Sequence, residues 1–409
     1  MATVMPPFFL KNRKLSGRGT TRNIKELRRK FFLNWKEKEG KMKVRREEAR
    51  KGGKAMLLYY TAAGAALAGG PLLARRPQYR RGFLLAAGLC CWLLASLRYV
   101  TGFDYRSYET IFRTIAAAGP SVLLQEGRLE SGYVLLNVAA ALLGGGYRAF
   151  LFLFHFILTA LVFAWIERYS PSPWMSVYLF VTLQYLALSM NLLRQALAAA
   201  VVLWTYPFLK SRRFLPFCGV VLLAGCFHRT ALVMIPLYFL LTLRVSKVHY
   251  GISALLAGSA YVLLDPLMNA ALSFFPAYRG YIGGRYWQSN SFVYMLFPLC
   301  LFLYTLPLIK QAAREPGKSP VLANCAFYSL LLQLFITRHF ILERFSIYTA
   351  FFSLLSLPEA ALGEGRRISP KGRTALLAAG ALAYFLFAAR EGFHGVYPYH
   401  GVWERALPR

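Results

Sequence analysis

Residues 190–209 read MNLLRQALAAAVVLWTYPFL, an apolar run of the length of a membrane-spanning helix. Three polar side chains interrupt the run near its start: Asn191, Arg194 and Gln195. A charged side chain in hydrocarbon costs a few kcal/mol even on lenient insertion scales, so it usually faces a polar cavity and has a partner or a ligand there. On one helix, Asn191 and Gln195 share a face and Arg194 lies on nearly the same stripe. The stretch therefore predicts a membrane helix that lines a polar cavity.

Composition extends this prediction to the whole chain, because 57% of its 409 residues are hydrophobic and only 16% are charged. These values are typical of an integral membrane protein. We predict an all-α fold, a polytopic transmembrane helical bundle with roughly 11–13 membrane segments. Several apolar runs are shorter than a full span, which predicts short or re-entrant segments that protein, not lipid, surrounds. The runs cover residues 56–74, 82–98, 131–146, 148–166, 173–189, 190–209, 214–227, 230–243, 249–264, 291–309, 321–338, 345–362 and 374–389.

The two ends of the chain differ from this membrane domain, which we place at 56–390. Residues 1–55 are rich in Lys and Arg with little apolar periodicity, so we expect a basic, disordered N-terminal extension. One alternative is a misassigned start, with Met42 or Met56 as the initiator, and another is a polybasic arm that binds acidic lipid. Residues 391–409 are expected to form a short C-terminal tail.

The formal net charge of +32 would also suit a nucleic-acid-binding protein. The basic residues, however, are concentrated in the extension and in short loops between apolar runs. The positive-inside rule and anionic membrane lipid explain that distribution without nucleic acid. Cytoplasmic basic loops place the turn at His228 and Arg229 outside the membrane. We expect Asp104 outside too, and the alternative places it inside together with the basic extension.

No motif for a bound cofactor is evident. The six cysteines lie in apolar segments without metal-ligand spacing, and no Walker A, Gly-x-Ser-x-Gly or His-Glu-x-x-His sequence is present. These absences, with that of a paired-aspartate motif in a soluble domain, disfavour a nucleotide-sugar synthase and an ATP-driven pump. We therefore expect neither a metal nor a cofactor.

Polar landmarks follow one another in a fixed order along the chain. Arg98-Tyr99-Val100-Thr101-Gly102-Phe103-Asp104-Tyr105 with Tyr108 follows an apolar run, and Glu130-Ser131-Gly132-Tyr133, Met190-Asn191 with Arg194-Gln195, and Phe227-His228-Arg229-Thr230-Ala231 come after it. In this order the landmarks resemble the EpsG family of Wzy-like polysaccharide polymerases. The resemblance covers roughly residues 56–360, and its order is more specific than any single landmark.

The resemblance implies a membrane glycosyltransferase of the bacterial cytoplasmic membrane. Such an enzyme polymerises polyprenyl-diphosphate-linked oligosaccharide repeat units on the outer face of that membrane, in making exopolysaccharide or capsule. The implied partners are the lipid-linked substrate, membrane lipid and other polysaccharide export proteins. This chemistry needs a cation for the diphosphate leaving group and a group that deprotonates or orients the acceptor hydroxyl.

Candidate residues for these tasks follow from their chemistry. Arginine binds phosphate bidentately and stays charged when desolvated, so Arg194 is the first candidate for the diphosphate. Glu130 and Asp104 are the first candidates for the base, with His228 close behind. Asn191 and Gln195 would bind sugar hydroxyls or hold Arg194. The remaining candidates for substrate binding are Arg229, Arg98, Arg338, Tyr105 and Tyr108.

Less specific interpretations remain for each of these residues. Arg194 could form a structural ion pair with Asp104 or Glu130, and His228 could be a helix-end histidine whose neighbours satisfy it. Arg338 could extend its charged group to the outer interface. Two other functions also fit: an O-antigen-type glycan ligase, which uses the same donor, and a flippase or transporter of lipid-linked sugars, in which internal repeats would be expected.

Overall fold

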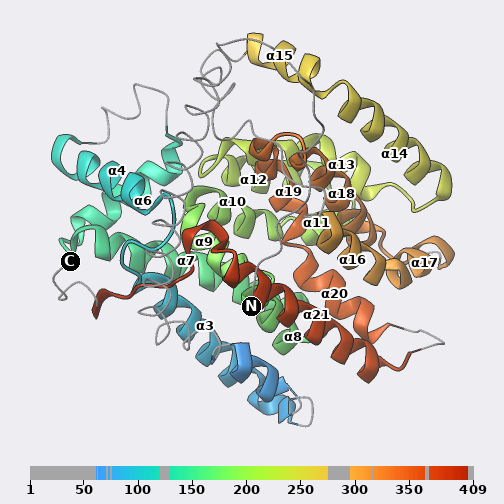
Figure 1. Ribbon diagram of the computed structural model, residues 1–409, viewed down its shortest axis with the longest axis horizontal. Coiled ribbons are helices and arrows are strands. Elements are labelled where there is room, and N and C mark those ends of the chain that lie inside the picture. The colour runs from blue at the N-terminus through green and yellow to red at the C-terminus, as the bar shows by residue number, and fades with distance from the viewer. Residues whose placement is uncertain are drawn as a thin grey trace, which may run out of the picture. The chain divides into compact units, whose positions relative to one another are not determined.

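The computed structural model describes residues 61, 63–70, 72–73, 76–119, 129–274, 295–315, 317–363 and 368–403, so the predicted extension at 1–55 lies outside the described residues. The described part is a set of packed helices in which no strand forms, and its one isolated β-bridge joins Arg98 to Gly401 (Figure 1). The predicted all-α fold is confirmed.

The helices are short and follow one another closely. In the first half they are η1 (Pro77–Tyr79), α3 (Arg80–Ser96), α4 (Tyr105–Ala118), α6 (Ser131–Leu142), α7 (Gly146–Tyr169), α8 (Pro173–Thr182), α9 (Tyr185–Asn191), α10 (Leu193–Leu203), α11 (Tyr206–Lys210) and α12 (Phe214–Gly225). In the second half they are η2 (Arg229–Val233), α13 (Met234–Thr242), α14 (Lys247–Val262), α15 (Leu264–Phe274), α16 (Leu296–Tyr304), α17 (Leu306–Arg314), α18 (Val321–Ile336), η6 (Phe340–Leu342), α19 (Glu343–Ala350), α20 (Ser353–Leu362), α21 (Pro370–Arg390) and η7 (Phe393–Gly395).

Among the described residues, two helices are long and apolar enough to cross a membrane, α7 with 24 residues and α21 with 21. Three pairs of helices pass the same test together but are bent: α14 with α15 by 75°, α16 with α17 by 42°, and the helices on either side of Phe351 by 52°. The other apolar helices, which include α6, α10 and α12, have 10–17 residues. The protein is therefore a helical membrane protein, and the prediction of short membrane segments is confirmed.

The apolar run at 190–209 does not form the single helix that we predicted. The chain bends at Leu192, whose φ of −101° and ψ of 60° end α9 and begin α10. It turns again before α11, where Pro207 occupies the first turn. The bend at Leu192 has a tertiary cause, because the side chain of Asn191 bonds to groups outside the helix.

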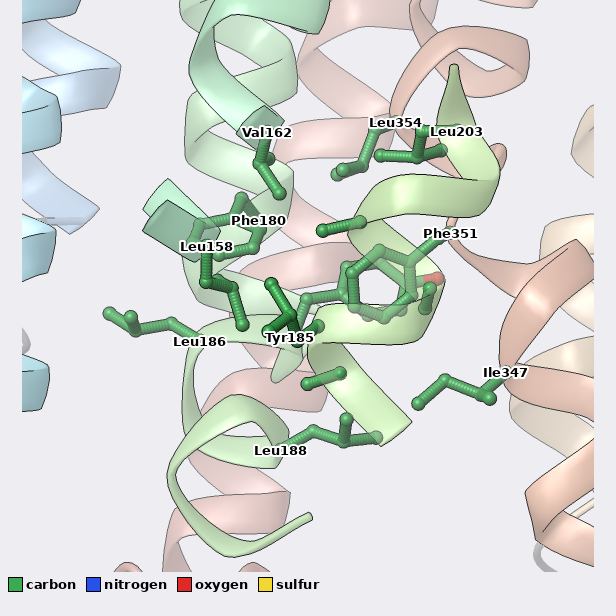
Figure 2. Packing of buried hydrophobic residues seen from close by; sticks show 14 of the residues in the cluster. Leu158, Val162, Phe180, Tyr185, Leu186, Leu188, Leu203, Ile347, Phe351 and Leu354 are labelled. Carbon is green, nitrogen blue, oxygen red and sulfur yellow. The ribbon is translucent and has the colours of Figure 1, made fainter. Parts of the chain in front are cut away.

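Helix α10 lies at the centre of the hydrophobic core. All of its side chains are buried except that of Arg194, which lies in its first turn and is partly exposed. Figure 2 shows the apolar residues that pack together in this region, among them Leu158 of α7, Phe180 of α8 and Phe351. A helix that is apolar on every side belongs in such a core. The buried residues that follow Arg194 in α10 therefore fix the position of its backbone.

Residues 391–403 pack onto the core. The backbone N–H of Tyr99 donates to the carbonyl of His400 at 2.8 Å, and that of Val402 donates to Leu97 at 2.9 Å. Val396 and Tyr399 are fully buried. The described part of the expected tail, residues 391–403, is therefore a strap that holds the loop between α3 and α4; we call it the C-terminal strap.

Candidate functional site

Glu130 is the centre of a cluster that joins three segments distant in the sequence. Its side chain is 7% exposed, and one carboxylate oxygen, Oε2, accepts a hydrogen bond from Arg194 Nη1 at 2.6 Å. The other oxygen, Oε1, accepts from His228 Nδ1 at 3.1 Å and from the backbone N–H of Arg229 at 3.2 Å. Four residues singled out from the sequence therefore meet at one carboxylate.

The backbone around Glu130 explains this convergence. Glu130 precedes α6 in an extended conformation, and His228 precedes η2 in the same conformation, so both side chains point away from their helices. Next to Glu130, the N–H of Gly132 donates to the carbonyl of Cys226 at 2.9 Å. A Cβ atom at Gly132 would approach that carbonyl oxygen to 2.8 Å, which is closer than real Cβ atoms come. Glycine is thus what lets the start of α6 contact the turn that carries His228.

The contacts within the cluster determine the charge states of Glu130 and His228, which both lie outside the apolar helices. Burial alone would raise the pKa of Glu130, but the His228 hydrogen bond, the Arg194 charge and the Arg229 N–H outweigh it and lower the pKa to about 2. Burial, helped by the Arg194 charge, lowers the pKa of His228 below its usual range, although the Glu130 hydrogen bond opposes this. At neutral pH the cluster therefore holds a carboxylate and a neutral imidazole. Because a carboxylate only accepts hydrogen bonds, His228 carries its proton on Nδ1 and its lone pair on Nε2.

Arg194 has donors beyond those that Glu130 uses. Its side chain is 23% exposed, and its guanidinium lies 5.8 Å from the centre of the Tyr133 ring. Tyr108 packs edge-on against the same ring, at 6.0 Å between ring centres. The Nε of Arg194 is buried and has no hydrogen-bond partner in the described part of the chain. Buried donors without a partner are rare in folded proteins, and a bound ligand can satisfy such a donor.

A second polar connection lies on the other side of the bend at Leu192. The side-chain oxygen of Asn191 accepts from the backbone N–H of Asp104 at 3.0 Å, and its amide nitrogen lies 2.9 Å from His394 Nδ1. The other ring nitrogen of His394 lies 3.5 Å from a carboxylate oxygen of Glu343. His394 and Glu343 were missed by the sequence analysis.

The backbone of His394 marks it as a special position. His394 has a φ of 51°, and Gly392 and Gly395 on either side of it also have positive φ. A positive φ is uncommon for a residue other than glycine and is held only where its surroundings determine it. The two flanking glycines are the sequence signal that could have indicated a constrained turn here.

Asn191 and Gln195 lie on either side of the bend at Leu192, so the prediction that one unbroken helix carries both was wrong. Gln195 donates to the backbone carbonyl of Arg344 at 2.6 Å, whereas Asn191 bonds to Asp104 and His394. His394 in turn lies beside Glu343, the neighbour of Arg344. The two amides therefore connect α9 and α10 to the start of α19, one directly and one through His394.

The other predicted residues lie in separate clusters. Arg98 is fully buried, with Nη1 2.7 Å from His155 Nε2 and its guanidinium over the ring of Tyr105. Arg338 pairs with Asp265 near His339. The predicted site residues thus divide between the Glu130 cluster, the Asn191 connection and these two arginine clusters. Within the described ranges, no group of three His, Cys, Asp or Glu side chains is placed to hold a metal ion.

The model of the EpsG family matches residues 82–400, which include every landmark described above. No curated protein and no solved structure matches the chain.

Proposed function

Because the chain belongs to the EpsG family, we propose that it is a membrane glycosyltransferase that polymerises polyprenyl-diphosphate-linked oligosaccharide repeat units. The reaction would take place on the outer face of the bacterial cytoplasmic membrane, during synthesis of exopolysaccharide or capsule. The observation that supports this chemistry is the cluster of Glu130, Arg194 and His228, in which a base and a phosphate-binding cation share one carboxylate.

In this proposal His228 is the general base. Its Nε2 takes the proton of the acceptor hydroxyl, and the hydroxyl oxygen then forms the new bond to the anomeric carbon of the donor sugar. The bond from that carbon to the diphosphate breaks, and the electron pair leaves with polyprenyl diphosphate. Glu130 holds the imidazole in the required tautomer and stabilises the imidazolium that forms, as a buried carboxylate does for histidine in other enzymes.

The low pKa of Glu130 is the reason that we assign the role of base to His228 and not to Glu130. A carboxyl group with a pKa of about 2 is a weak base at neutral pH, and both of its oxygens already accept hydrogen bonds. A neutral imidazole is better matched to this pH. Asp104 remains the alternative base, since its backbone is held beside Asn191.

Arg194 would bind the diphosphate. Its unpartnered Nε and its partial exposure leave donors for phosphate oxygens while Nη1 stays on Glu130. Arg229, next to His228, would supply a second cation. Tyr108 would line the same region, whereas Arg98, being fully buried, would hold Tyr105 in place instead of binding substrate.

Asn191 and Gln195 would act as positioning residues. Asn191 holds the Asp104 loop and Gln195 holds the start of α19, so each fixes one wall next to Arg194. Partners in this proposal are the lipid-linked substrate, membrane lipid and the export proteins that receive the polymer.

The test uses a strain of the source bacterium that lacks the gene, complemented with wild type, Arg194→Ala or Arg373→Ala. Arg373 is the matched control, because it is an arginine that is more deeply buried than Arg194 but bonds to the carbonyls of Ala361 and Gly363 instead of a carboxylate. Polymer length, lipid-linked single repeat units and membrane abundance are measured together.

We expect Arg194→Ala, at normal abundance, to lose long polymer and to accumulate single repeat units on the outer face. Arg373→Ala should keep its polymerisation per molecule of protein. Unchanged polymer with Arg194→Ala would contradict the assigned site. Accumulation on the inner face would indicate a flippase, and normal polymer that fails to reach its final acceptor would indicate a ligase.

A further inference from the structure

The turn that carries His228 occurs a second time in the protein, at His339. In both places an apolar helix, α12 or α18, ends three residues before the histidine. The histidine itself is extended, with φ and ψ of −157° and 117° at His228 and −136° and 113° at His339. A short 3-10 helix, η2 or η6, then leads into the next α-helix.

The backbone hydrogen bonds of the two turns are the same. The N–H of each histidine donates to the carbonyl four residues earlier, at 3.0 Å from His228 to Ala224 and 3.1 Å from His339 to Phe335. The carbonyl of each histidine accepts from the residue three positions later, Ala231 or Leu342. The repeat is one of conformation, since the two sequences, CFHRTAL and TRHFIL, share little more than the histidine and an arginine beside it.

The side chains repeat as well. One oxygen of Asp265 lies 2.6 Å from His339 Nε2, and the other accepts from Arg338 Nη2 at 2.5 Å. In the first cluster, Glu130 also divides its two oxygens between a histidine and an arginine, although His228 bonds through Nδ1 and Arg194 comes from a third segment, whereas Arg338 is next to His339. Each cluster thus consists of a histidine, an arginine and one carboxylate from a distant segment.

An apolar hollow lies beside both turns. Its volume is about 230 Å³. Val233 of η2 lines it from the first turn, Leu342 of η6 lines it from the second, and Leu264 lines it next to Asp265. The remaining lining residues are Leu332, Phe335 and Phe345. Apolar walls beside a charged cluster suit a ligand with a hydrocarbon chain and a charged end.

We propose that Asp265, Arg338 and His339, together with this hollow, bind the second lipid-linked substrate. This inference rests on the proposed function, because polymerisation joins two sugar chains that are each attached to a polyprenyl diphosphate. The diphosphate contacts Arg338, and the first isoprene units lie in the hollow. The cluster around Glu130 binds the diphosphate that leaves.

The contacts of Arg338 leave room for this ligand. Its side chain is 33% exposed, and Asp265 is 45% exposed. Within the described part of the chain, one N–H donates to Asp265 and another to the backbone carbonyl of Tyr261, at 3.1 Å, which leaves three of its five N–H groups for phosphate. Arg373, by contrast, is 7% exposed and closed off by backbone carbonyls.

The test counts bound lipids on the purified full-length protein by native mass spectrometry, with a polyprenyl diphosphate that carries no sugar as the probe. Wild type should bind two, Arg338→Gln one, Arg194→Gln one, and the double variant none. Leu264→Trp, which fills the hollow but keeps the ion pair, should weaken the second binding event by about tenfold or more. Inorganic diphosphate and phosphatidylglycerol serve as competitors and should not displace the second lipid at equal concentration.

One lipid on wild type, two on Arg338→Gln, or displacement by phosphatidylglycerol would overturn the inference. Failure of the proposed function gives a different result, in which Arg194→Gln keeps both lipids while Arg338→Gln still loses one. The two ideas can therefore fail separately.

Discussion

Replacing Glu130 with glutamine removes one negative charge and little volume. The amide oxygen can still accept from His228 and the Arg229 N–H, but Arg194 loses its counter-ion at 2.6 Å. Removing one partner of a buried ion pair costs about 3–5 kcal/mol, and the 23% exposure of Arg194 puts this case near the lower figure. If the transition state loses the same stabilisation energy, about 3 kcal/mol corresponds to a rate that is roughly a hundredfold lower.

The assay for Glu130→Gln measures polymer formed per molecule of membrane protein, with thermal unfolding in detergent as a second reading. Glu109→Gln is the matched control, because Glu109 also accepts from two basic side chains, but these belong to the exposed Arg106 and Arg113. Exposed pairs contribute about 0–1 kcal/mol, so the control should lose less than about fivefold. A Glu130→Gln protein that polymerises as fast as Glu109→Gln would show that the Glu130–Arg194 ion pair is not needed for activity.

Three further predictions concern neighbouring groups. Activity should be constant above neutral pH and should fall on acidification, with a midpoint below the usual pKa of a histidine. The reason is that the pKa of His228 is lowered and the base must be neutral. A midpoint above the usual histidine pKa in a pH–rate profile would contradict this assignment. Arg194→Lys should reduce polymerisation by about 10–100-fold, because lysine keeps the charge but lacks the planar fork with which arginine binds carboxylate and phosphate bidentately. Arg373→Lys, assayed beside it, should change polymerisation per molecule of protein by less, because Arg373 donates only to backbone carbonyls. His394→Ala should lower activity and the protease resistance of the C-terminal strap together, since it removes the bond to Asn191; limited proteolysis that is unchanged from wild type would argue against the strap.

The same pKa shifts make the fold sensitive to acid. A lowered pKa in the folded state means that the unfolded state binds more protons, so stability rises with pH. The contribution of Glu130 is present above pH 4.5 and is lost as the pH falls towards about 2. His228 adds a loss that begins below its usual pKa of 6.5. Unfolding followed in detergent from neutral to acidic pH should therefore show decreasing stability, and a flat profile would contradict these shifts.

Sequence reasoning identified Arg194, Glu130 and His228 because a polar residue next to an apolar run is conspicuous whatever the fold. It left open whether Arg194 pairs with Asp104 or Glu130. That choice depends on Gly132, which lets α6 approach the turn at Cys226, and on the burial of α10. Neither feature produces a periodic pattern in the sequence.

The bend at Leu192 could not be predicted for a related reason. Leucine is a good helix former, and nothing in 190–209 before Pro207 breaks a helix. The bend depends on Asn191 bonding to Asp104 and to His394, which is 203 residues further along the chain. His394, Glu343 and Asp265 were missed for the same reason, because their roles depend on contacts with residues far away in the sequence. All three lie at the ends of apolar runs or beyond them.

Polymerisation from a lipid-linked donor can be measured by adding the purified protein, in lipid nanodiscs, to the lipid-linked repeat unit of its source bacterium. Polymer length and released polyprenyl diphosphate are followed without any nucleotide. We expect one polyprenyl diphosphate to be released for each repeat unit added to the chain, and Glu130→Gln to slow both by roughly a hundredfold. Polymer that forms only when a nucleotide sugar is supplied, or no release of diphosphate from a folded protein, would contradict this expectation.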